Sequence, residues 1–245
     1  MAHLVLDFGN TQKKLALFDK GRLTMVESHT AVTKSVIARF ISQRPGITAC
    51  ILSSVVSHSP AIPKFLELKM HYIGLDAHTP VPLRNRYRTK GTLGKDRLAA
   101  AVYGATAFPG ENVLVINAGT ALTYDFVDSG GEYPGGSISP GMQMRFNALH
   151  TFTDRLPLIS YAGKVSPVGT TTRTSILSGV VNGMVAEMEG IANGYRERFP
   201  GLVVVLSGGD LNYFVKRLKI SIFARPNVVI HGLQQILAFN VPESS

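Results

Sequence analysis

Apolar and polar positions alternate along the first part of the chain in a way that predicts strands and helices in turn. An apolar strand over residues 3–7 is followed by a Gly-Asn-Thr turn and two more alternating segments, which predict a β-hairpin or meander. Later segments have helical spacing or the apolar content of buried strands: helices at 32–43, 62–69 and 95–108, and strands at 49–56 and 70–73. This order indicates an α/β layer structure.

The pattern starts again at Val113. A strand over residues 113–117 ends at Asn117, and a Gly119-Thr120 turn leads into a second strand over residues 121–127. The two turns lie 110 positions apart (117 − 7 = 110), which indicates an internal duplication. Further predicted elements are a Gly/Pro-rich loop at 135–141, a helix at 176–199, a strand at 203–206 and a closing helix that includes 233–239. We expect two paired lobes, residues 1–112 and 113–245.

Composition places the chain among globular proteins, with 45% hydrophobic and 17% charged residues. No run of about 18 apolar residues occurs, so no membrane span is expected. The N-terminus reaches Asp7 before a signal-peptide apolar stretch could form. The single cysteine, Cys50, is interpreted as a buried thiol and cannot form an internal disulfide. These features favour a cytoplasmic location.

The net charge of +9 raises nucleic acid as a partner, but the charge is unevenly distributed. Residues 1–115 carry 15 basic and 7 acidic residues (15 − 7 = +8), and the remainder of the chain carries 10 and 9 (+1). Six basic residues lie within the fourteen positions from Arg84 to Arg97, where Asp96 alone opposes them in the sequence. We therefore expect a local field suited to an anionic substrate, and we do not expect nucleic acid as a partner.

The first turn, Asp7-Phe8-Gly9-Asn10-Thr11, has the groups needed to hold a phosphate. Glycine permits close backbone approach, Asn and Thr donate hydrogen bonds, and a carboxylate at a strand end can hold magnesium directly or through water. An ordinary turn is the alternative, since these residues are common in turns. The repeated turn at Gly119-Thr120 favours the phosphate interpretation, because two hairpins that face one another are how actin-like kinases hold a nucleotide. Walker A, Gly-x-Gly-x-x-Gly, serine-hydrolase and zinc-ligand patterns are absent from the sequence.

A second candidate motif, Gly94-Lys95-Asp96-Arg97, opens the predicted helix at 95–108. A carboxylate beside two cations at a helix N-terminus stays ionised, and Arg97 offers a fork for a substrate carboxylate. In phosphoryl transfer a carboxylate accepts the proton of the attacking hydroxyl, so Asp96 is the candidate base. The alternative is a helix-capping acid on a solvated surface.

Two further motifs precede or follow predicted elements. Gly169-Thr170-Thr171-Thr172 precedes the long helix, so one threonine is expected as its N-cap. Another threonine offers a hydrogen bond to a polar ligand; a capping role alone is the alternative. Ser207-Gly208-Gly209-Asp210 follows an apolar strand, where a glycine pair permits flat approach of an adenine; a plain turn is the alternative.

Taken in order, these motifs resemble the type III pantothenate kinase family from residue 3 to about 240. The resemblance rests on the following: Asp7-x-Gly-Asn-Thr11, Tyr87 before Gly94-Lys-Asp-Arg97, Ala118-Gly-Thr-Ala121, Gly135-Gly-x-Ile-x-Pro-Gly141, Ala148-Leu149 through Leu156-Pro157, Gly169-x-x-Thr172 and Ser207-Gly-Gly209. It implies an α/β actin-like fold of two ribonuclease-H-like lobes with mixed sheets, a homodimer, and ATP-dependent phosphorylation of pantothenate, the first step toward coenzyme A.

The resemblance also implies roles for individual residues. ATP would contact the first turn and Thr120, that is Asp7, Phe8, Gly9, Asn10, Thr11, Gln12, Lys13, Lys14 and Thr120. Pantothenate would contact Tyr87, Gly94, Lys95, Asp96, Arg97 and Thr172, with Thr172 reaching the partner subunit's site. Asp96 falls on the family's proton acceptor, and Asp7 is the magnesium candidate.

One position departs from the family. Asn117 stands where the family usually has an aspartate that binds a monovalent cation such as potassium or ammonium. An amide oxygen brings no negative charge, so we expect reduced or absent potassium dependence, with Asp125 as a possible substitute ligand.

Two alternative functions stay open at this point: a nucleic-acid-associated transcriptional accessory protein, and an actin-like kinase for acetate or a sugar. The basic loop holds only Tyr87 as an interleaved aromatic and no recognition motif, which disfavours the first. The motif at residues 94–97 disfavours the second.

Overall fold

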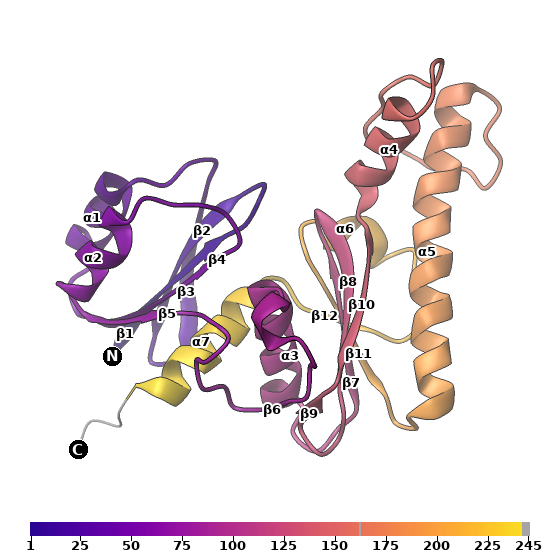
Figure 1. Ribbon diagram of the computed structural model, residues 1–245. Coiled ribbons are helices and arrows are strands. Elements are labelled where there is room, and N and C mark those ends of the chain that lie inside the picture. Colours follow the sequence, from indigo (N-terminus) through magenta and orange to yellow (C-terminus); the bar gives the residue numbers. More distant parts are fainter. Residues whose placement is uncertain (162, 242–245) are drawn as a thin grey trace. The chain divides into compact units, whose positions relative to one another are not determined.

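In the computed structural model, which describes residues 1–161 and 163–241, the chain divides into two compact units (Figure 1). The first contains residues 1–109, the short segment 131–134 and residues 227–241, and the second contains residues 110–130, 135–161 and 163–226. Among the described residues, no helix is both long and apolar enough to cross a membrane.

The first unit is built on a five-stranded mixed sheet with the order β3-β2-β1-β4-β5. Its strands are β1 (Ala2–Phe8), β2 (Lys13–Asp19), β3 (Arg22–His29), β4 (Ile47–Ser54) and β5 (His71–Gly74). β1 pairs antiparallel with β2 and parallel with β4. The predicted hairpin and the predicted buried strand at 49–56 are thereby confirmed; the parallel direction of β4 relative to β1 comes from the structure.

Alternate residues of β1 enter different cores, as expected for a strand buried on both faces. Leu4 and Leu6 pack with α1 (Lys34–Ser42) and α2 (Ala61–Glu67), while Val5 packs with α3 (Lys95–Ala107) and α7 (Val228–Asn240). Val5, Asp7 and Asp96 are therefore brought to one side of this sheet, because Asp7 follows Val5 by two positions and Asp96 lies at the start of α3.

The second unit repeats the same topology. Its sheet has the order β10-β8-β7-β11-β12, formed by β7 (Val113–Ala118), β8 (Ala121–Val127), β10 (Gly135–Pro140), β11 (Val203–Ser207) and β12 (Phe223–Ala224). β7 pairs antiparallel with β8 and parallel with β11, as β1 does with β2 and β4. The duplication predicted from the two turns is therefore present in the strand order and strand directions of both sheets.

The described residues of the second unit form the helices α4 (Met142–Thr151), the 27-residue α5 (Thr172–Arg198) and the short α6 (Leu211–Phe214). The buried apolar side of β7 and β8 packs against α5, through residues such as Tyr124, Val181 and Met184. Thr171 caps α5 and forms a capping box with Thr174, which confirms the expected threonine N-cap.

Two sequence expectations differ from the structure. The predicted loop at 135–141 is wrong, because residues 135–140 form β10, an edge strand whose small, mostly exposed residues carry no apolar alternation. The expected lobe 113–245 also differs from the units, because α7 and residues 131–134 group with the first unit. α7 packs on α3 and supplies Leu233 and Leu237 to the core beside β1.

Candidate functional site

The first turn closes between the ends of β1 and β2. Asp7 pairs with Lys14 and Phe8 with Lys13 in the antiparallel register. The Gly9 N–H donates to the Gln12 carbonyl (3.0 Å), so this N–H closes the turn and is not turned toward a ligand. Asn10, Thr11 and Gln12 form an exposed tip. In this structure the Gly9 N–H is therefore engaged within the turn, so the predicted phosphate contact does not use it.

The two lysines after the turn have different partners. The Lys13 ammonium donates to the Thr30 carbonyl (3.1 Å), whereas the Lys14 ammonium donates to Asn227 Oδ1 (3.2 Å). Asn227 has a left-handed backbone (φ 59°) and precedes α7 as its N-cap. Sequence reasoning missed Asn227, although an asparagine just before a helical pattern is itself an N-cap signal. Lys14 is thus held at the Asp7 end of the sheet by the start of α7.

Asp7 lies in an environment that disfavours its negative charge. Burial and the nearby charge of Asp96 raise the pKa of Asp7 from 3.8 to about 6, against the opposing effect of Lys14. A bound cation would relieve both unfavourable contributions. Among the described residues no group of three or more His, Cys, Asp or Glu side chains could hold a metal by itself. One carboxylate completed by phosphate oxygens and water fits magnesium, which keeps several waters and uses few protein ligands.

Asp96 sits in the first turn of α3, where the sequence motif predicted it. Its Oδ1 accepts the Arg97 N–H (3.0 Å), which holds the carboxylate at the helix start. A Cβ on Gly94, the N-cap residue, would lie 2.7 Å from the same oxygen. Glycine at position 94 therefore leaves the space that the Asp96 carboxylate occupies.

Tyr87 and Arg97 are brought together in the first unit. The Arg97 guanidinium lies 5.7 Å from the centre of the Tyr87 ring, and Arg97 is only 5% exposed. The Tyr87 N–H donates to Asn85 Oδ1 (3.0 Å), which fixes the backbone before the ring. Tyr87 and Arg97, which are both predicted to bind pantothenate, thus contact one another. Burial means that Arg97 is pre-oriented and does not extend freely into solvent.

The positive charge of the basic loop is partly opposed by an acidic residue that is distant in the sequence. Glu132, 46 positions after Arg86, accepts a hydrogen bond from the Arg86 guanidinium (2.8 Å) and pairs with Arg84 (3.2 Å). Its hydrogen bond with Arg86 and the nearby positive charges lower the pKa of Glu132. Sequence reasoning missed Glu132 because its partners are distant in the chain. Arg88 and Lys90 remain exposed cations of this loop.

The second turn lies in the second unit, between β7 and β8. The Gly119 N–H donates to the Ala121 carbonyl (3.0 Å), and the Gly141 N–H donates to the Thr120 carbonyl (3.2 Å). Thr120 is exposed and Asn117 is partly buried. Asn117 of β7 pairs with Thr123 of β8, and Val115, two positions before Asn117, pairs with Asp125. Asp125 is fully buried. Asp125 is therefore near Asn117 in the sheet but enclosed by protein.

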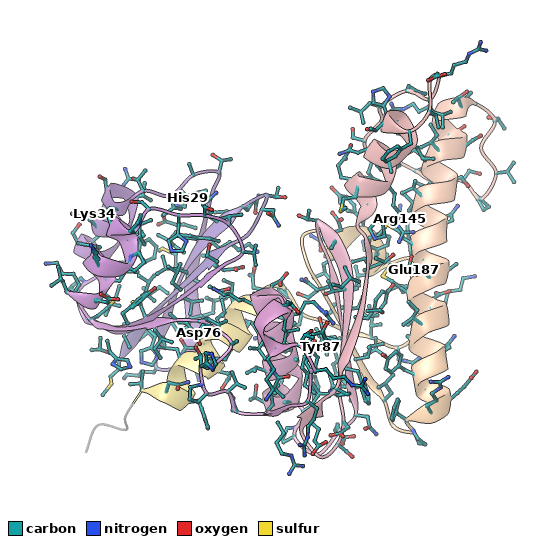
Figure 2. All side chains as sticks on the ribbon, in the orientation of Figure 1. His29, Lys34, Asp76, Tyr87, Arg145 and Glu187 are labelled. Carbon is teal, nitrogen blue, oxygen red and sulfur yellow. The ribbon has the colours of Figure 1, made fainter. Side chains whose placement is uncertain are left out.

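A partly buried ion pair supports the segment that touches this turn. Arg145 of α4 pairs with Glu187 of α5 (Figure 2), and its Nε donates to the Pro140 carbonyl (2.8 Å). The Tyr124 hydroxyl donates to the other Glu187 oxygen (3.1 Å), and burial with the Glu187 charge raises the Tyr124 pKa. This network joins α4, α5 and β8 beside Gly141. Sequence reasoning missed it because Arg145 and Glu187 stand on different helices.

The remaining predicted ligand residues also belong to the second unit. Gly208 has φ +103°, and a Cβ there would lie 2.0 Å from the Ala118 carbonyl oxygen, so this turn packs directly on the end of β7. Gly209 is exposed, with nothing within 4 Å of its Cβ position. Thr172 is the exposed first residue of α5. A cavity of about 220 Å³ beside it is lined by the loop at 164–170 together with Thr174 and Leu177.

The duplicated hairpin and mixed sheet place this chain in the class of actin-like ATPase-fold proteins. A ROK family glucokinase from Streptomyces griseus has a TM-score of 0.53 at 10% identity, covering 98% of this chain and 100% of that chain. A Campylobacter jejuni protein assigned to the Baf family of transcriptional activators has a TM-score of 0.60 at 17% identity, covering 97% and 98%. These likenesses show the fold.

Sequence comparison then gives the particular family. The sequence model of type III pantothenate kinase matches residues 3–194. A type III pantothenate kinase of Phocaeicola vulgatus is 45% identical over 239 residues, covering 97% of this chain and 98% of the relative. One of Bacteroides fragilis is 41% identical over 240 residues, with the same coverage. The chain belongs to the type III pantothenate kinase family.

Proposed function

We propose that this protein is a kinase that transfers the γ-phosphate of ATP to pantothenate and forms 4'-phosphopantothenate, the first step of coenzyme A biosynthesis. The observation that carries the proposal is the contact between the Arg97 guanidinium and the Tyr87 ring, 5.7 Å apart, where Arg97 directly follows the candidate base Asp96. Burial and the charge of Asp96 also raise the pKa of Asp7, at the end of β1, which supports a charged site at this end of the sheet.

Asp96 acts as the general base in this proposal. Its carboxylate accepts the proton of the primary hydroxyl of pantothenate as that oxygen attacks the γ-phosphorus and the bond to the β-phosphate oxygen breaks. Asn10, Thr11 and Lys14 orient and neutralise the phosphates, with Thr120 contributing from the second hairpin. Asp7 holds magnesium directly or through water; when bound, the ion neutralises charge on the phosphates.

Pantothenate recognition rests on Tyr87 and on residues 94–97. Arg97 is preset by its contact with the Tyr87 ring, so little side-chain entropy is lost when its guanidinium meets a carboxylate. The Gly94 backbone and Lys95 supply further polar contacts. Thr172 contacts the substrate held by the second subunit of a homodimer.

Several exposed apolar residues of the second unit support the homodimer. Phe152 is 84% exposed and Val168 73% exposed, and Ile138 and Met144 are also exposed. These residues supply apolar surface that a second subunit would cover. A cytoplasmic location is supported by Cys50, which is buried and free.

The cation requirement is proposed to be weak. Asn117 offers an amide oxygen at the end of β7, and the fully buried Asp125 pairs two register positions away. A neutral ligand attracts potassium or ammonium less than the usual aspartate does.

The test is ADP formation from ATP with pantothenate, acetate or glucose as the acceptor, each in potassium, ammonium and sodium buffers. We expect turnover with pantothenate alone and similar rates in the three cations. Turnover with acetate or glucose but not pantothenate would refute the assignment. Salt-sensitive duplex DNA binding well above the nonspecific level would support the transcriptional alternative instead; the pairing of Arg84 and Arg86 with Glu132 counts against it.

A further inference from the structure

A short segment of the second repeat is built into the first unit. Residues 131–134 connect β8 to β10, and within them β9 (Glu132–Tyr133) pairs in parallel with β6 (Arg84–Asn85). The Arg84 N–H donates to the Gly131 carbonyl, and the Arg86 N–H donates to the Tyr133 carbonyl, both at 2.9 Å. The backbone just before Tyr87 is therefore fixed by a segment that follows it by about 45 positions.

Side chains reinforce this pairing on the exposed side. Glu132 lies between Arg84 Nε (3.2 Å) and Arg86 Nη2 (2.8 Å). Exposed ion pairs contribute little stability each, but two pairs from one carboxylate specify which residues of the strands lie opposite. Tyr133 is thus placed in one register relative to the loop that carries Tyr87.

Tyr133 lies directly behind Tyr87. The two rings are stacked, with centroids 6.2 Å apart and an interplanar angle of 11°. Tyr133 is fully buried, whereas Tyr87 is partly exposed and lies within 5.7 Å of the Arg97 guanidinium. A buried ring that stacks on Tyr87 restricts the directions in which Tyr87 can turn.

We propose that Tyr133 is a positioning residue for the acceptor substrate. It does not touch the substrate, because it is fully buried; it holds the Tyr87 ring in the orientation that Arg97 requires. This inference rests on the proposed function, in which Tyr87 and Arg97 contact pantothenate. It assigns part of the substrate specificity of the first unit to a residue from the connection between β8 and β10.

The experiment compares Tyr133→Leu with Tyr133→Phe, which keeps the stacked ring. For Tyr133→Leu we expect the KM for pantothenate to rise about five- to tenfold. The KM for ATP should stay within about twofold of the wild type, since the phosphate turn is untouched. Tyr133→Phe should retain the wild-type KM for pantothenate. Calorimetric titration with pantothenate, in the presence of a non-hydrolysable ATP analogue, should show the same loss of affinity.

A second variant, Glu132→Ala, is tested in case the Tyr133→Leu protein does not fold. Glu132→Ala removes the exposed ion pairs and leaves the buried ring, and should raise the KM for pantothenate about two- to fourfold with the KM for ATP unchanged. If Tyr133→Leu folds, a wild-type KM for pantothenate in this variant would overturn the inference. If it does not fold, a wild-type KM for pantothenate in Glu132→Ala would overturn it. An equal rise of both KM values would do the same. A wild-type enzyme without activity on pantothenate would instead refute the proposed function, and this inference with it.

Discussion

Asp7, at the end of β1, is electrostatically coupled to Asp96, in the first turn of α3: burial and the charge of Asp96 raise the pKa of Asp7 to about 6. The two aspartates are 89 positions apart (96 − 7 = 89) and belong to separately predicted motifs. Their proximity makes the free protein less stable when both are ionised, and it prepares the site for the positive charge of a bound metal.

In the absence of nucleotide, Asp7→Asn should raise the free energy of unfolding at high pH. An unfolded Asp7 loses its proton near pH 3.8, whereas the folded protein holds it to about pH 6. Stability therefore falls as pH rises between these values, by at most about 3 kcal/mol, and the loss persists above pH 6. Asp7→Asn should be more stable than the wild type by about 1–3 kcal/mol at pH 8 in urea unfolding, with the difference absent near pH 4, and should lose turnover.

Asp19→Asn provides the matched control for this variant. Asp19 is an exposed aspartate at the far end of the same hairpin, paired with Ala2 in the register. This substitution should leave both stability and turnover unchanged. A lower stability of Asp7→Asn at pH 8 would show that the Asp7 charge is not destabilising.

Asp96→Asn tests the general base. Turnover should fall by about 10²–10⁴, because an amide cannot accept the hydroxyl proton. The Asn side-chain oxygen can still accept the Arg97 N–H, so the start of α3 should be retained. Steady-state rates at saturating ATP and pantothenate, with circular dichroism to check folding, measure this. Near-normal turnover would remove Asp96 from the role of base.

Asn117→Asp tests the cation site. Restoring a carboxylate at the end of β7 should create potassium activation that the wild type lacks, because a formal charge strengthens cation binding. Initial rates in matched potassium and sodium chloride measure the effect, and Asn147→Asp, which adds the same charge at an exposed position of α4, is the control. Strong, saturable potassium activation of the wild type would contradict the prediction.

Gly208 and Gly209 are adjacent in the turn after β11. Substituting each in turn separates an effect on stability, through packing, from an effect on ATP binding. Gly208→Ala should destabilise the protein by more than about 2 kcal/mol, because its Cβ would overlap the Ala118 carbonyl and its φ is positive. Gly209→Ala meets nothing within 4 Å and should keep the wild-type melting temperature. If adenine lies flat on this turn, Gly209→Ala raises the KM for ATP without loss of stability. Equal melting temperatures of the two variants would show that Gly208 is not closely packed.

Local sequence patterns predicted the elements that carry most of the candidate site. Alternation over residues 3–7 and 113–117 predicted the paired hairpins, and Thr171 was predicted among the cap residues of the long helix. β10 was missed because an edge strand needs no apolar alternation; its Gly136 would place a Cβ 1.7 Å from the Tyr124 carbonyl oxygen. That constraint is invisible until β8 and β10 are paired.

The sequence by itself determined the duplicated hairpins, the helix start at Gly94 and the family, because these depend on residues close together in the chain. Only the tertiary structure decided that Asp7 lies near Asp96, that Glu132 opposes Arg84 and Arg86, and that Tyr133 stacks on Tyr87. These relationships join segments between 46 and 89 positions apart, and electrostatics and ring packing act through distance in space rather than along the chain.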